Sequence, residues 1–144
     1  MNPKLTAVTL GVKSVPESAR FYEALGLQRK VKATGDEIAF YEAGGVVLAL
    51  WGWDKLADDA VQLEAPRPAA FRGSTLAWNC ASTQEVDAIF AHALKVGGKL
   101  LRRAEKTEYG GYRAYFSDPD GHVWEVVHAP GFDFTADGRL VLPD

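Results

Sequence analysis

The chain carries the same helix-start signal twice, and this repeat constrains the fold more than any other feature. Ser14 is followed three residues later by Glu17, and Ser82 is followed three residues later by Glu85. A serine N-cap with a glutamate at the third helical position satisfies exposed backbone N–H groups, so each pair predicts a helix start. One β-like stretch precedes each signal and three follow it. The sequence therefore predicts two β-α-β-β-β modules.

The two modules account for most of the chain. In the first, a helix runs from Ser14 to the stop signal at Gly26, and strands are expected at residues 5–12, 27–32, 37–42 and 46–51. In the second, a helix runs from Ser82 to near Gly97, and strands are expected at residues 74–81, 99–103, 112–117 and 122–128. The predicted organisation is a first module at 1–53, a linker at 54–72, a second module at 73–129 and a tail at 130–144. Two such modules form a single α+β domain, in which curved mixed sheets with helices on their convex side pair around a cleft.

The last hairpin of the second module places an acid inside an apolar strand. The turn Asp118-Pro119-Asp120-Gly121 combines a proline, which fixes φ, with a glycine, which accepts positive φ. In the strand that follows, Glu125 lies on one face and its two neighbours lie on the other. A dry, unpaired carboxylate is costly, so Glu125 needs a partner, water or a functional role.

Composition excludes several classes of function. The 144 residues suit one domain, and a net charge of −3 offers no basic patch, so nucleic acid is not an expected partner. No apolar run approaches the roughly 20 residues of a membrane span, and the N-terminus lacks a signal-peptide pattern. The single cysteine, Cys80, excludes an internal disulfide and a thiolate cluster for zinc, and it is expected to be buried and inert. We therefore expect a cytoplasmic protein without a membrane partner.

Several motifs together resemble one family. They are the double βαβββ pattern, residues 15–22 followed by 25–27, the 106–112 segment with its two glycines, and residues 118–125. This combination resembles the vicinal oxygen chelate superfamily, which includes glyoxalase I, bleomycin-resistance proteins and extradiol dioxygenases. The resemblance covers nearly the whole chain and implies the fold. It leaves the reaction open, because the superfamily hosts isomerases, oxygenases and non-catalytic drug binders.

The resemblance also implies four metal-ligand positions, one on the first and one on the last strand of each module. They fall on Ala7, Ala49, Thr75 and Glu125, of which only Glu125 is a competent ligand. Zinc, nickel or iron needs about three or more protein ligands. The three histidines lie elsewhere, at His92, His122 and His128. We therefore expect no cofactor and no complete metal site, with Glu125 as the ligand if a divalent metal is bound.

Aromatic side chains are expected around the cleft. Trp51 shares the strand face of Ala49, Trp53 lies at the rim, and Tyr109 and Tyr112 flank a glycine pair that could close over a ligand. Aromatic faces beside a lone carboxylate suit a planar or cationic small molecule. The alternative is that these tryptophans serve the core or an interface. The predicted ligand-binding residues are Trp51, Trp53, Asn79, Tyr109, Tyr112, Arg113 and Glu125, whereas Trp78 and Trp124 are assigned to the core.

Glu125 has three interpretations at this point. It binds a ligand cation, acts as a general base, or forms an ion pair with a neighbour such as Arg113. As a base it would need an oxyanion stabiliser, and Tyr109, Arg113 or Asn79 could donate a hydrogen bond for that purpose.

The leading hypothesis is a glyoxalase- or bleomycin-resistance-like protein that binds a small organic molecule in an aromatic cleft, without a complete metal site, as a homodimer. One alternative is a metal-dependent lyase, isomerase or dioxygenase of the same superfamily. Another is a metal-free enzyme with Glu125 as general base. A third is a dimeric binding protein whose tryptophans lie at the subunit contact.

Overall fold

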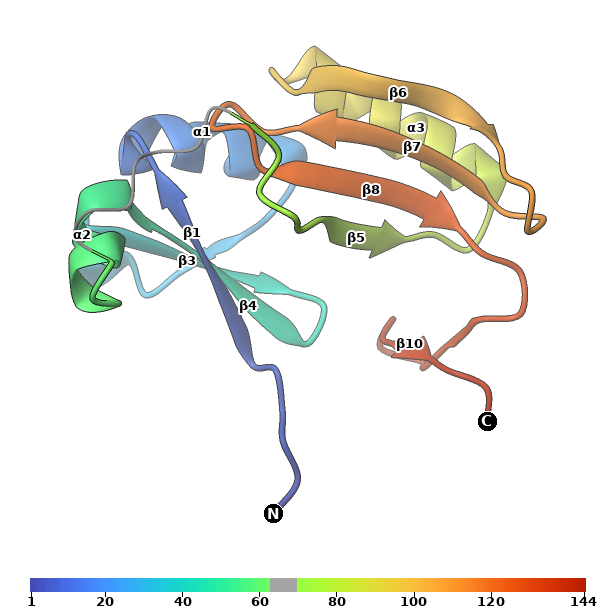
Figure 1. Ribbon diagram of the computed structural model, residues 1–144, viewed down its shortest axis with the longest axis horizontal. Coiled ribbons are helices and arrows are strands. Elements are labelled where there is room, and N and C mark those ends of the chain that lie inside the picture. Colours follow the sequence, from blue (N-terminus) through green and yellow to red (C-terminus); the bar gives the residue numbers. More distant parts are fainter. Residues whose placement is uncertain (63–69) are drawn as a thin grey trace. The chain divides into compact units, whose positions relative to one another are not determined.

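The predicted pair of β-α-β-β-β modules is confirmed (Figure 1). The computed structural model describes residues 1–62 and 70–144, and it divides into two compact units, Met1–Arg72 and Gly73–Asp144. Each unit contains a four-stranded sheet of its own. None of the helices within the described residues is long and apolar enough to cross a membrane.

The first unit contains the sheet with strand order β1-β4-β3-β2, in which β1 and β4 run parallel and the other pairs run antiparallel. Its elements are β1 Ala7–Val12, α1 Val15–Leu25, β2 Arg29–Lys30, the 3-10 turn η1 Lys32–Thr34, β3 Ile38–Ala43, β4 Val46–Gly52 and α2 Trp53–Asp59. The predicted cap of α1 is confirmed, since the Ser14 Oγ accepts a hydrogen bond from the Glu17 N–H at 3.3 Å. Gly26 ends the helix at a φ of 123°, a conformation that favours glycine.

Helix α1 packs on one face of the first sheet. The rings of Tyr22 on α1 and Tyr41 on β3 lie 6.4 Å apart, and both side chains are fully buried. The Tyr41 hydroxyl donates to Glu23 on α1 at 3.2 Å, which ties the helix to the sheet. The opposite face of this sheet, which we call the front face of the first sheet, carries Thr9, Ala49 and the residues paired with them.

Two segments of the first unit differ from the sequence prediction. The strand expected at 27–32 is only two residues long, because Val31 adopts a left-handed φ of 49° and the chain turns there. Thr34 fixes that turn, since its Oγ1 donates to the Val31 carbonyl at 3.0 Å. The helix α2, of seven residues, spans the end of the predicted first module and the first part of the predicted linker. Residues 63–69 of that linker lie outside the described residues.

The second unit repeats the arrangement with strand order β5-β8-β7-β6. Its elements are β5 Leu76–Asn79, α3 Thr83–Lys95, β6 Lys99–Lys106, β7 Tyr112–Ser117, β8 Val123–His128, β9 Asp133–Phe134 and β10 Leu140–Val141. The Ser82 cap is again confirmed, with the Glu85 N–H donating to its Oγ at 3.1 Å. The tail forms a small hairpin of β9 and β10, which the sequence did not predict.

Helix α3 covers one face of the second sheet, behind β6 and β7 in the view of Figure 1. Phe116 and Trp124 are buried on this face, and their rings stack 6.2 Å apart. Trp78 pairs with Val126 and so lies on the same face as Trp124, but it is only half-buried, whereas Trp124 belongs to the core as predicted. The face turned away from α3 is the front face of the second sheet.

Candidate functional site

Polar side chains gather on the front face of the second sheet in two neighbouring rows that cross all four strands. Strand pairing places the first row at Ala77, Glu125, Tyr115 and Arg102. The adjacent row consists of Asn79, Val127, Arg113 and Glu105. Paired residues in a sheet point to the same side, so these charged and phenolic groups share one surface.

Glu125 is half-buried, and its partner in the described chain is a tyrosine. The Tyr115 hydroxyl donates a hydrogen bond to the Glu125 Oε2. This hydrogen bond, with the charge of Glu125, raises the pKa of Tyr115 to about 12, and burial adds to the increase. Tyr115 is therefore a neutral donor at physiological pH, and Glu125 acts toward it as an acceptor.

Of the three interpretations of Glu125, the ion pair with Arg113 is not seen among the described residues. The Arg113 Nη1 instead lies 3.2 Å from the Glu105 Oε1, and the Arg102 Nε lies 2.7 Å from the same oxygen. These two guanidinium groups hold the pKa of Glu105 below its usual value, with the Arg102 hydrogen bond as the larger cause. Glu105 is the direct cross-strand neighbour of Arg113 on β6, which favours this ion pair.

Arg113 also lies against the ring of Tyr115. Its guanidinium carbon is 5.9 Å from the ring centroid, within the range of a cation–π contact. The Arg113 side chain is only 12% exposed, whereas Glu105 and Arg102 are about half exposed or more. One polar chain thus runs across the front face, from Arg102 through Glu105 and Arg113 to Tyr115 and Glu125.

Tyr112 does not share the face of Glu125. It alternates with Arg113 along β7, and its hydroxyl donates to the Asp87 Oδ1 of α3 at 2.7 Å. That hydrogen bond raises the pKa of Tyr112. The structure therefore places Tyr112 on the helix side of the sheet, where its visible contact is with α3.

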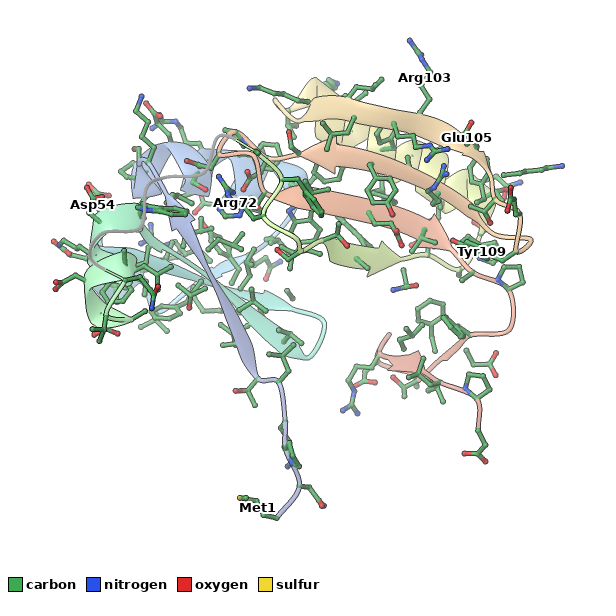
Figure 2. All side chains as sticks on the ribbon, viewed as in Figure 1. Met1, Asp54, Arg72, Arg103, Glu105 and Tyr109 are labelled. Atoms are coloured by element: carbon green, nitrogen blue, oxygen red, sulfur yellow. The ribbon has the colours of Figure 1, made fainter. Side chains whose placement is uncertain are left out.

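Tyr109 lies in the connection between β6 and β7 and is 66% exposed (Figure 2). Thr107 ties this connection together through hydrogen bonds with both glycines. Its N–H donates to the Gly111 carbonyl at 2.9 Å, its Oγ1 accepts from the Gly111 N–H at 2.9 Å, and its carbonyl accepts from the Gly110 N–H at 3.2 Å. Closure of Tyr109 over a ligand stays a prediction. It would have to begin from a turn that these three hydrogen bonds hold together.

The two candidate tryptophans belong to the first unit. Trp51 pairs with Gly11 and Ile38, so it lies on the front face of the first sheet, the face of Ala49. Trp53 opens α2 and packs on that same face, because a Cβ built on Gly11 would lie 2.9 Å from the Trp53 Cε3. The guanidinium carbon of Arg72 lies 5.6 Å from the centroid of the Trp53 ring. Trp53 thus has protein contacts that hold α2 on the sheet.

Cys80 carries no reactive thiolate. Its side chain is 2% exposed, and burial raises the pKa of the thiol to about 12. The His128 Nδ1 lies 3.1 Å from the Cys80 carbonyl oxygen, so both residues take part in joining the end of β8 to the turn before α3. This agrees with the prediction of a buried, inert cysteine.

The residues at the metal-ligand positions do not fit a transition metal. Two of the four positions, Ala7 and Ala49, have methyl side chains, and Thr75 has a neutral hydroxyl. Glu125 alone offers a carboxylate, and its Oε2 is hydrogen-bonded to Tyr115. In the described part of the chain, no three side chains among His, Cys, Asp and Glu come together as a metal-binding group.

Sequence reasoning missed Tyr115, Glu105 and Arg102. Tyr115 could have been found, because the turn closed by the Asp118 N–H and the His122 carbonyl fixes the hairpin register and sets Tyr115 opposite Glu125. Glu105 and Arg102 could not, because β6 shifts register between Leu100 and Arg102 and again between Arg102 and Glu105. Such bulges leave no reliable period-two pattern.

Known proteins share this fold. The family profile described as Glyoxalase/Bleomycin resistance protein/Dioxygenase superfamily matches residues 4–126. A glyoxalase-related enzyme from Fulvimarina pelagi is 34% identical and superposes with a TM-score of 0.86, over 98% of this chain and 99% of that one. A glyoxalase/bleomycin resistance protein/dioxygenase from Nocardioides is 25% identical, with a TM-score of 0.74 over 91% of this chain and 87% of that one.

A curated relative has a more specific name. Metallothiol transferase FosB of Shouchella clausii is 26% identical over 120 residues, which are 83% of this chain and 75% of that protein. The profile match covers most of the chain and agrees with the fold of the solved relatives. The chain therefore belongs to the glyoxalase/bleomycin resistance protein/dioxygenase superfamily.

Proposed function

We propose that this protein binds a small organic molecule on the front face of its second sheet, with Glu125 and Tyr115 as the recognition pair and without a metal held between them. One observation carries the proposal: Glu125 is a half-buried carboxylate whose partner in the described chain is a neutral phenol. A neutral donor satisfies one oxygen but leaves the charge uncompensated. A ligand with a cationic or N–H group would supply the missing interaction.

A purely structural role for Glu125 is the competing explanation. A carboxylate that only stabilised the sheet would be expected beside a cation, and two arginines, Arg102 and Arg113, share its face of the sheet. Arg102 and Arg113 both bind Glu105 instead. The arrangement therefore keeps Glu125 available, which favours ligand recognition over structural pairing.

The name of the Shouchella clausii relative raises the alternative of a metal-dependent transferase. The residues of this chain argue against carrying that chemistry over, because Glu125 is the one ligand-type side chain at the four positions. We therefore propose that a divalent metal is not a resident cofactor. A metal-dependent lyase, isomerase or dioxygenase would need at least two further ligands beside Glu125.

Metal-free catalysis is the second candidate, and the hydrogen bond between Tyr115 and Glu125 supports it. Glu125 is already oriented as a proton acceptor, and the Arg113 guanidinium lies against the same phenol ring. Glu125 would take an acidic substrate proton while Tyr115 or Arg113 stabilised the developing negative charge. In that case Glu125→Gln would abolish turnover and leave the fold intact.

The test is a screen of small organic fragments by two-dimensional NMR on uniformly labelled protein treated with a chelator. We expect hits that shift the amide signals of residues 76–79 and 123–128, and we expect Glu125→Gln to remove those shifts. Glu42→Gln is the matched control, because Glu42 is an exposed strand carboxylate on the front face of the first sheet. Hits that bind the Glu125→Gln variant equally well would contradict the proposal.

Two further expectations belong with this function. We propose that the protein acts in the cytoplasm and forms a homodimer, which light scattering coupled to size-exclusion chromatography would test. Concentration-dependent tryptophan fluorescence would support the third alternative, in which the tryptophans lie at the subunit contact. A monomer at all concentrations would exclude it.

A further inference from the structure

Two opposite charges on the front face of the second sheet lie close together without pairing. Glu125 pairs with Tyr115 across β8 and β7, and Arg113 pairs with Val127 in the next row. Glu125 and Arg113 are therefore diagonal neighbours, which puts their Cβ atoms about 7 Å apart. Side chains of this length could meet, but Arg113 binds Glu105 instead.

Each of the two groups keeps unused hydrogen-bonding capacity. A guanidinium has five N–H donors, and in the described chain Nη1 is the Arg113 nitrogen with a protein acceptor. On Glu125, Oε2 accepts from Tyr115, which leaves Oε1 for another donor. Both groups are also held in place, since Arg113 is 12% exposed and lies against the Tyr115 ring. Held groups with free donors and acceptors bind a ligand with little ordering cost.

We propose that the ligand is a zwitterion of the α-amino acid type, with its ammonium group on Glu125 and its carboxylate on Arg113. The inference rests on the proposed function of this face and specifies the ligand class. An ammonium and a carboxylate on one carbon are about 3 Å apart, and a charge-assisted hydrogen bond of about 2.8 Å at each end lets the ligand bridge at most about 9 Å between a Glu125 oxygen and an Arg113 nitrogen. Diagonal neighbours on a sheet, whose Cβ atoms are about 7 Å apart, can hold their charged ends within that distance. The carboxylate would be bound by the two-pronged guanidinium geometry that favours arginine over lysine.

Glu105 is a positioning residue in this arrangement. It binds Arg102 and Arg113 through the same oxygen, at 2.7 and 3.2 Å, and so carries one negative charge against two positive ones. The surplus positive charge on this side of Tyr115 favours a ligand carboxylate there. Glu105 also keeps Arg113 from neutralising Glu125 in the absence of ligand, so both halves of the zwitterion find their partners available.

A ligand with a single charge would leave one of the two groups unused. An organic cation would satisfy Glu125 and meet an unfavourable positive charge at Arg113. An organic anion would satisfy Arg113 and meet an unfavourable negative charge at Glu125. Only a molecule with both charges at short separation is favoured by both groups.

The experiment is calorimetric titration of chelator-treated protein with a panel of standard L-amino acids, followed by the methyl ester and the N-acetyl derivative of the tightest binder. We expect the ester, which lacks the carboxylate, and the N-acetyl form, which lacks the ammonium, each to bind at least about tenfold more weakly. Arg113→Met should weaken the amino acid and should not weaken the ester, which loses only an unfavourable positive charge. Glu105→Gln should weaken both the amino acid and the ester, because Arg113 is then able to neutralise Glu125, with Glu108→Gln on the neighbouring turn as the matched control.

The outcomes separate this inference from the proposed function. An ester that binds as tightly as the amino acid, and that Glu125→Gln weakens, would overturn the zwitterion and retain the recognition pair. A panel without any binder would overturn the zwitterion, and the fragment screen would then decide the proposed function. Circular dichroism of Arg113→Met excludes loss of fold, and Arg113→Lys provides a second variant that keeps the charge but loses the two-pronged geometry.

Discussion

The two modules place different chemistry at equivalent positions. Strand pairing aligns Thr9, Ala49 and Phe40 in the first sheet with Ala77, Glu125 and Tyr115 in the second. In the next row, Gly11, Trp51 and Ile38 correspond to Asn79, Val127 and Arg113. The first front face is small and aromatic, and α2 packs on it at Gly11. The second carries the acid, the phenol and the arginine. One fold thus supports packing in one copy and recognition in the other.

The comparison shows what an acid requires at this position of the sheet. Ala49 is 2% exposed and faces Phe40, which has no hydroxyl. Glu125 is half-buried and faces Tyr115, which donates a hydrogen bond. The hydroxyl of the cross-strand partner is the local difference that lets the second module hold a carboxylate.

The largest expected effect comes from moving the acid into the first module. Ala49→Glu would bury a carboxylate opposite Phe40, without a donor, and we expect it to lower the free energy of unfolding by about 3–5 kcal/mol. Urea unfolding followed by circular dichroism measures the change. Adding Phe40→Tyr should restore part of the loss, since it recreates the pair seen between Tyr115 and Glu125. Equal stability of the single and double variants would contradict the role of the hydroxyl.

The second effect concerns the packing of α2 on the first sheet. Gly11→Ala would place a methyl group 2.9 Å from the Trp53 ring, and we expect a cost of about 1–3 kcal/mol from overpacking. A blue or red shift of tryptophan emission should accompany the loss of thermal stability. Gly52→Ala is the matched control, because a Cβ there meets nothing within 4 Å. Similar melting temperatures for both variants would argue against the close packing of Trp53 on β1.

A smaller effect is expected from removing the phenol of the recognition pair. Tyr115→Phe leaves Glu125 without its donor, which costs about 1 kcal/mol of folding free energy. It should also weaken the fragments that depend on Glu125, as titration by NMR would show. Tyr112→Phe is the control on the opposite face of β7, where the hydroxyl binds Asp87. A fragment affinity that drops in Tyr112→Phe but not in Tyr115→Phe would place the binding site on the face that α3 covers and contradict the proposal.

The smallest effect is a dependence of stability on alkaline pH. The folded pKa of Tyr115 is about 12, raised above the ordinary value of 10.0 by its hydrogen bond to Glu125. Stability from this group is therefore fully present below pH 10 and is lost as pH rises toward 12. We expect wild type to lose more stability across this interval than Tyr115→Phe, as measured by denaturant unfolding at each pH. The same loss of unfolding free energy with pH in both proteins would contradict a raised pKa of Tyr115.

The fold was predictable because local signals agreed with each other. The serine caps at Ser14 and Ser82, the glycine stops and the alternating strands all indicated two copies of one module, and the hydrogen bonds at both caps confirm them. The strand at 27–32 was overestimated, because its valine and glutamine fit a β pattern while Val31 in fact turns the chain. Strand propensity could not report that left-handed residue.

The site was predictable only in part. Glu125 stood out as an acid in an apolar strand, and Arg113 and Asn79 were named as candidate donors, but only the strand pairing places them on its face. Tyr112 was grouped with them by its closeness in sequence to the glycine pair, but its hydroxyl points to α3. The partner of Arg113 could not be foreseen, because Glu105 reaches it through two register shifts in β6. Cross-strand neighbours depend on the pairing register, and a bulge shifts that register in a way that residue alternation in the sequence does not reveal.

The most direct measurement is the affinity of the tightest fragment for chelator-treated protein, before and after addition of zinc, nickel or manganese ions, in wild type and in Glu125→Gln. The account predicts the same affinity with and without metal in wild type, less than one equivalent of tightly bound metal, and loss of binding in the variant. Binding that appears only after a stoichiometric metal is added, and that Glu125→Gln removes together with the metal, would contradict it.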